Sequence, residues 1–133
     1  MPKLTDEMKE LLKDNLCYIA TASSDGAPCV APKSCRFTGD GELYFIEWAG
    51  KKTYHNLVTN PRVAITTCSA DKKLSYRFEG PVRVLTSGPL FDAEDKRRQE
   101  KGKRPAVAIV MVDVAEVYDM GKKNPGGRVE IFP

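Results

Sequence analysis

The stretch that decides the fold is residues 50–63, which read GKKTYHNLVTNPRV. Two lysines and a threonine follow the glycine, and a short run with helical spacing then ends at Asn60, because proline excludes the residue before it from a helix. A strand pattern resumes at Arg62 and continues to Cys68. The segment therefore predicts a basic turn, a short helix and a strand in immediate succession.

The basic turn concentrates groups that bind anions. Lys51 and Lys52 supply ammonium groups, Thr53 supplies a hydroxyl, and the first turn of a helix has backbone N–H groups without acceptors. Together these groups suit a phosphate dianion. The spacing also fits a solvated lysine pair before a threonine-capped surface helix, because short basic turns are common and the segment is no Walker loop.

Residues near the turn give weaker signals. Lys33 lies on a strand that a hairpin connects to the strand before the turn, but a lone lysine is usually solvated. Alternation puts Lys33 and Ser34 on opposite sides of their strand unless Pro32 makes it irregular. Aromatic side chains at positions 44 and 48 either flank a planar ligand or belong to the core.

The rest of the chain is dominated by strand patterns. Pro32 predicts an edge strand or a bulge, Asp40-Gly41 predicts a hairpin, and Gly80-Pro81 predicts a sharp bend. The sum is one domain over residues 1–133, mainly β with helices, in which about six antiparallel strands form a barrel. The six strand patterns span residues 17–22, 29–37, 42–48, 62–68, 74–85 and 106–118.

Two further helices are predicted. Thr5 can cap the first, and a charged helix is expected over residues 91–101, with residues 94–101 as its solvated face. Residues 121–128 are too rich in glycine and proline to form a regular element.

Composition and charge exclude several functions. The chain of 133 residues has a net charge of +3, which lacks the clustered basic character of a nucleic-acid binder. The longest apolar run, residues 106–112, is too short to span a membrane, and charge near the N-terminus argues against a signal peptide, so we expect a cytoplasmic protein. Four cysteines without zinc or Cys-x-x-Cys spacing predict structural thiols and no metal site.

Residues 50–63 resemble the lysine/threonine, Asn-Leu, Asn-Pro-Arg-Val signature of the pyridoxamine 5′-phosphate oxidase-like, FMN-binding split-barrel proteins. The resemblance extends over nearly the whole chain, through residues 19–21, Pro32, residues 78–80 and residues 114–119. It implies a split β-barrel and a homodimer with two FMN sites between the subunits. It also implies an oxidoreductase that passes hydride or electrons between a nicotinamide or protein donor and an acceptor.

The resemblance also implies which residues bind FMN. Lys51, Lys52 and Thr53 would hold the phosphate, assisted by two residues of the second strand. Glu47, Trp48 and Ala49, at the end of the strand that follows the hairpin, would line the isoalloxazine edge. Asn56 would fix the helix against the strand or reach the ribityl chain. No catalytic acid or base is implied, and no partner activates His55. The additional positions are Lys33, Ser34, Glu47, Trp48, Ala49, Asn56 and, for the partner's site, the tail at residues 124–128.

Other functions stay open at this point. The chain could be an FMN-binding electron carrier or flavin store, a split barrel that binds F420, or a barrel that binds only another protein. A haem protein needs an axial ligand, and His55 within the phosphate-binding helix is poorly placed to supply one. The chain is shorter than true pyridoxamine 5′-phosphate oxidases and lacks their arginine-rich C-terminal motif, so we do not expect oxidation of vitamin B6.

Overall fold

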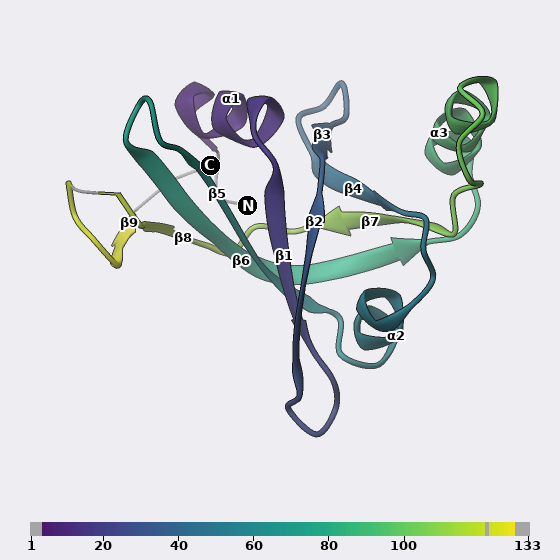
Figure 1. The fold of residues 1–133 in the computed structure, drawn as a ribbon, viewed down its shortest axis with the longest axis horizontal. Helices are drawn as coiled ribbons and strands as arrows, with labels where there is room; N and C mark the ends of the chain where they lie inside the picture. Colours follow the sequence, from purple (N-terminus) through teal and green to yellow (C-terminus); the bar gives the residue numbers. More distant parts are fainter. Residues whose placement is uncertain (1–3, 122, 130–133) are drawn as a thin grey trace.

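The computed structural model describes residues 4–121 and 123–129, which form three helices and nine strands (Figure 1). No helix in this described part is long and apolar enough to cross a membrane. The elements are α1 (Asp6–Asp14), β1 (Cys17–Ala22), β2 (Pro28–Lys33), β3 (Cys35–Phe37), β4 (Leu43–Glu47), α2 (Lys52–Thr59), β5 (Arg62–Ser69), β6 (Leu74–Leu85), α3 (Pro89–Glu100), β7 (Ala108–Val112), β8 (Glu116–Asp119) and β9 (Gly127–Val129).

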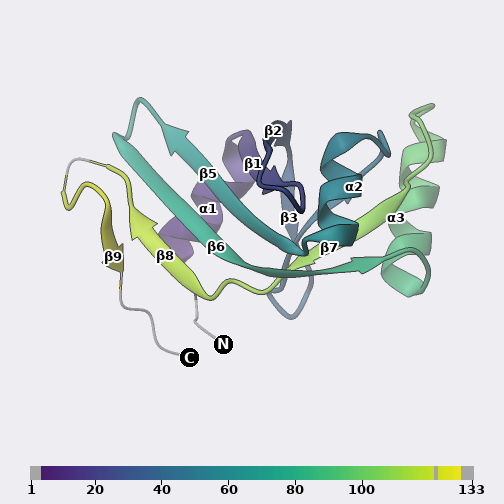
Figure 2. The same ribbon diagram turned by 90° about the horizontal axis from the view of Figure 1, so that it is seen from below.

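The nine strands form one curled antiparallel sheet (Figure 2). Seven of them follow the order β2-β1-β5-β6-β7-β4-β3, while β8 pairs with β6 and β9 pairs with β8. The first half of β6 pairs with β5 and β8, and its second half pairs with β7. Strands β2 and β3 lie at opposite ends of this order although they are adjacent in the chain, so the barrel is split between them. The predicted split barrel of antiparallel strands with helices is therefore confirmed, and Pro32 lies on an edge strand as expected.

Gly80 is required where β6 changes partners. A Cβ atom built on Gly80 would lie 1.9 Å from the backbone oxygen of Asp113. The backbone of the 113–115 connection passes this closely because Asp113 N donates to Pro81 O at 2.9 Å and Ala115 N donates to Glu79 O at 2.8 Å. The predicted bend at Gly80-Pro81 thus coincides with the crossing between the two halves of the sheet.

The structure has nine strands instead of the six predicted, because two predicted strands each divide in two and the tail adds a third extra strand. The 29–37 segment divides at Ser34, because β2 pairs with β1 whereas β3 pairs with β4. The 106–118 segment divides between β7 and β8 for the same reason. The glycine-rich tail, predicted to be irregular, contains β9, whose backbone pairs with β8 from Val117 to Asp119; backbone pairing here overrides residue preference.

Helix α1 covers the core, and α3 departs from its prediction. The Thr5 hydroxyl caps α1 by accepting from Met8 N at 3.2 Å, as the sequence predicts. Met8, Leu11 and Leu12 are buried. In α3, the expectation of a solvated charged face is wrong at Glu94, which is only 2% exposed and pairs with two arginines.

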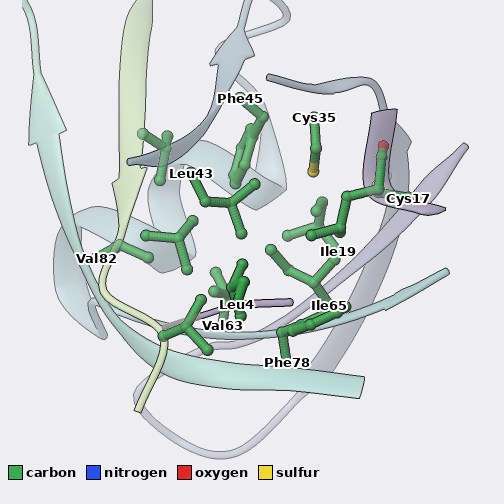
Figure 3. Packing of buried hydrophobic residues seen from close by; sticks show 14 of the residues in the cluster. Leu4, Cys17, Ile19, Cys35, Leu43, Phe45, Val63, Ile65, Phe78 and Val82 are labelled. Atoms are coloured by element: carbon green, nitrogen blue, oxygen red, sulfur yellow. The ribbon is translucent and has the colours of Figure 1, made fainter. Parts of the chain in front are cut away.

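The core lies inside the curled sheet (Figure 3). Strand alternation turns Ile19 and Cys17 inward, where they pack with residues of β4, β5 and β6. The neighbouring Cys17 thiol and burial raise the pKa of Cys35, so the Cys35 thiol stays protonated. Cys68 is exposed, so the expectation of buried structural thiols does not hold for every cysteine.

Candidate functional site

Helix α2 begins without a side-chain cap. Gly50 has a φ of +64°, and Lys51 occupies the N-cap position with no side-chain hydrogen bond. Lys51 and Lys52 are exposed. No side-chain oxygen of the described residues accepts from the first turn, so its N–H groups lack side-chain acceptors next to two exposed lysines. The threonine-capped helix that the sequence left open does not form, because Thr53 lies one residue inside the helix.

Thr53 and Asn56 connect α2 to the sheet. Thr53 is buried, and its hydroxyl lies 3.9 Å from the Sγ atom of Cys29 on β2. The Asn56 side-chain amide donates to the Thr21 hydroxyl on β1 at 3.1 Å, in a buried hydrogen bond. Of the two roles that the resemblance implies for Asn56, the structure shows that it fixes the helix against a strand.

A buried ion pair shapes the turn before α2. Lys33 Nζ lies 3.1 Å from Glu47 Oε1, and the Lys33 and Glu47 side chains are 8% and 1% exposed. The other carboxylate oxygen of Glu47 accepts from Ala49 N at 2.9 Å and from Gly50 N at 3.0 Å. Lys33 is therefore no solvated lysine, and Glu47 holds the backbone that leads into the basic turn. Ser34 is exposed, as alternation predicts.

Replacing Glu47 with glutamine should lower the free energy of unfolding by about 3 kcal/mol, because it leaves the Lys33 ammonium buried without a counter-charge. Urea denaturation monitored by circular dichroism measures this change. Glu42→Gln is the matched control: Glu42 pairs with Arg83 at the surface, where loss of the pair should cost less than about 1 kcal/mol. Equal losses in the two variants would contradict a stabilising role for the Lys33–Glu47 pair.

Trp48 lies among cations at the surface. Its ring is 39% exposed, and three cationic groups lie within 6 Å of the ring centroid: Lys33 Nζ at 5.3 Å, Arg98 Cζ at 5.6 Å and Arg104 Cζ at 5.8 Å. Tyr44 is buried against Ile109 and serves the core instead. Of Tyr44 and Trp48, Trp48 is therefore the one exposed enough to contact a ligand.

A cleft of about 290 Å³ opens beside Trp48 and brings several predicted site residues together. His55 is exposed on α2, and its ring contacts only that of Tyr54 in the described part of the chain, with centroids 6.0 Å apart. The arginines that contact Trp48 were not predicted as site residues. The basic run at residues 96–104 was their only signal, and nothing in it indicates contact with position 48. The cleft is lined by Leu16, Pro32, Lys33, Ser34, Arg36, Ile46, Trp48, Arg98 and Lys103.

The fold and the site define this chain as a split antiparallel barrel with an uncapped, basic helix start. Comparison with known proteins then shows the family. Residues 4–121 match the family described as pyridoxamine 5′-phosphate oxidase. An uncharacterized protein of Methanocaldococcus jannaschii is 30% identical over 131 residues, covering 96% of this chain and 87% of that protein. The chain belongs to the pyridoxamine 5′-phosphate oxidase-like split-barrel family.

Solved structures agree with this assignment. HupZ of Group A Streptococcus has a TM-score of 0.82 at 25% identity, covering 96% of this chain and 100% of that one. A putative pyridoxamine 5′-phosphate oxidase of Lactobacillus delbrueckii has a TM-score of 0.72 at 27% identity, covering 87% and 93%. Two other solved structures are similar in fold alone: an FMN-binding protein of Syntrophomonas wolfei, at 17% identity, and an F420 reductase, at 20% identity.

Proposed function

We propose that this chain binds FMN at the start of α2 and acts as an FMN-dependent oxidoreductase. The observation that carries the proposal is the uncapped first turn of α2, with two exposed lysines and the Thr53 hydroxyl beside it. A phosphate dianion supplies the acceptors that these donors lack. The FMN-binding protein and the putative oxidase among the solved structures support the choice of cofactor.

Residues 47–53 offer separate contacts for the phosphate and for the isoalloxazine ring of FMN. Lys51, Lys52 and Thr53 would hold the phosphate, and the exposed face of Trp48 would contact the isoalloxazine ring. Glu47 fixes the backbone between these two groups through Ala49 N and Gly50 N. Bound FMN supplies one-electron or two-electron transfer, and the surrounding protein sets its potential by nearby charge. Positive charge at Arg98 would stabilise an anionic ligand beside Trp48, whereas the charge of Lys33 is offset by Glu47.

We also propose that two copies of the chain pair through the outer face of β1 and β2. Strand alternation turns Tyr18 and Val30 outward, 43% and 66% exposed, and Leu16 beside them is 54% exposed. Val30 is paired with Ala20, and Tyr18 with Pro32, so these apolar side chains form one continuous patch. Such patches on soluble proteins mark interfaces. Cys29, the neighbour of Val30 in β2, contacts Thr53 from the opposite face of the strand, so β2 itself connects the patch to the proposed phosphate site.

Val30→Asp should turn the dimer into a monomer and lower the apparent affinity for FMN, because the site would lose its second subunit. Light scattering after size exclusion, combined with a flavin titration, measures both effects. Met120→Asp is the control, since Met120 is also an exposed apolar residue but lies directly after β8, outside β1, β2 and α2. A dimer that survives Val30→Asp, or tight FMN binding by the monomer, would contradict this geometry.

The absorption spectrum of the purified protein tests the cofactor directly, followed by mass identification of whatever heat releases. A flavin spectrum and released FMN are expected. If F420 is released instead, the proposed site stands but its cofactor is F420. The similar fold of an F420 reductase is the reason to test for it. A colourless protein that also refuses added FMN would overturn the proposed function.

A further inference from the structure

We propose that the basic groove, which begins at the cleft beside Trp48 and extends beyond the proposed FMN site, binds the phosphates of a nicotinamide dinucleotide that serves as electron donor. This proposal rests on the proposed function, because an electron donor is needed only if the chain is an FMN-dependent oxidoreductase. The basic groove is a set of adjoining hollows between α3 and strands β3 and β4. It is lined by Lys13, Arg36, Arg97, Arg98, Lys101 and Lys103.

The groove has the size of a ligand site. One hollow measures about 460 Å³ and is lined by Lys13, Arg36 and Arg97; the other is the cleft of about 290 Å³ beside Trp48. Ser34 and Arg36 line both hollows, so the two lie next to each other. Pockets of about 300 to 1,000 Å³ accommodate small organic ligands.

The charge of the groove is unusual for this chain. Seven cationic residues line it, and one of them, Lys33, is already paired with Glu47. Among the described residues that line the groove, Glu94 is the one carboxylate, so the six other cations and this one anion leave an excess of five positive charges. The excess of five positive charges exceeds the net charge of +3 on the whole chain, so the remaining residues are negative on balance. Positive charge is therefore gathered in the groove, which favours a ligand with several negative charges.

Glu94 fixes two arginines at the centre of the groove. Its carboxylate oxygens lie 3.5 Å from Arg36 Nη1 and 3.4 Å from Arg97 Nη1. One carboxylate neutralises only one of the two guanidinium groups, and the planar donors of arginine match phosphate oxygens well. Burial, together with the Glu94 carboxylate, raises the pKa of Tyr44, whose side chain lines the same hollow and stays a hydroxyl donor.

The position of the groove selects the ligand. It begins at Trp48, three residues before Lys51 of the basic turn proposed for FMN, and continues along α3. A dinucleotide whose phosphates lie at Arg36 and Arg97 would have its nicotinamide end free to reach the flavin. The cations line hollows instead of a flat face, which favours a small polyanion over an acidic protein surface.

Fluorescence of Trp48, the one tryptophan of the chain, tests the proposal. The probe is ADP-ribose, which has the pyrophosphate of the dinucleotide without its nicotinamide, titrated into the full chain with and without FMN. The expected result is saturable binding that weakens at least about tenfold in Arg36→Gln/Arg97→Gln. Lys13→Gln/Lys103→Gln should weaken it too, and this second variant leaves Glu94 paired with both arginines.

The control variant Lys72→Gln/Lys123→Gln removes the same number of charges from the β5–β6 and β8–β9 turns, at the end of the molecule opposite α3 (Figure 1). It should bind ADP-ribose as the unaltered chain does. Absence of ADP-ribose binding, equal weakening in the control, or binding of a polyglutamate peptide in place of ADP-ribose would each overturn the proposal. Binding of ADP-ribose by a chain that refuses FMN would support the groove and refute the proposed flavin function separately.

Discussion

Lys52→Ala/Thr53→Ala is expected to weaken FMN binding by about a hundredfold or more while leaving riboflavin binding within a few-fold of its original value. Hydrogen bonds to a charged group contribute about 1.5–3 kcal/mol each, and the two substitutions remove two donors to the phosphate. Riboflavin has no phosphate, so it does not use these donors. Parallel titrations of the two flavins, followed by flavin fluorescence, give the two affinities and their ratio.

The comparison between the flavins separates a phosphate site from general damage to the fold. Thr53 is buried against β2, so its loss could disturb α2, and such a disturbance would weaken both flavins alike. Equal losses for FMN and riboflavin would therefore refute the phosphate assignment. Lys72→Ala/Thr86→Ala is the matched control, since both residues are exposed and lie outside the site; it should change neither affinity.

Gly80→Ala is expected to lower the free energy of unfolding by more than about 3 kcal/mol. The added Cβ would meet the Asp113 backbone oxygen at 1.9 Å, and a backbone atom cannot move aside as a flexible side chain can. The connection that would have to shift also makes the Asp113–Pro81 and Ala115–Glu79 backbone hydrogen bonds. Urea denaturation of the two proteins measures the difference.

Gly39→Ala is the control for this substitution. Nothing lies within 4 Å of a Cβ at Gly39, and its backbone has no positive φ. The variant should be about as stable as the original chain, because it meets no steric obstacle and restricts the unfolded chain slightly. If Gly80→Ala were equally well tolerated, the close crossing between β6 and the 113–115 connection would not be a requirement of the fold.

Features with a strong local cause were predictable from the sequence. Pro61 ends α2, Thr5 caps α1, and Gly80-Pro81 lies where β6 changes partners, each for a reason contained in two or three adjacent residues. The division of strands at Ser34 and after Val112 was not predictable. Neither place has the glycine or Asp-Gly signal of a turn, and the partner strand changes there.

The candidate site shows the same limit. The basic turn at residues 51–53 is continuous in the sequence, so its chemistry could be inferred from composition and spacing. The partners of Trp48 could not, because Arg98 and Arg104 approach it only after α3 and the following loop fold back onto the sheet. Glu94 was assigned to solvent because it lies in a highly charged helix, yet tertiary contacts with Arg36 bury it.

The continuity of β6 has a consequence for how the chain unfolds. One strand of 12 residues contributes hydrogen bonds to three neighbours, β5, β7 and β8. Neither half of the barrel can therefore detach without breaking the pairing of this common strand, which joins the two halves into a single cooperative unit. The backbone amides of β6 should accordingly exchange with solvent only through global opening, whereas those of the edge strand β2 exchange through local fraying.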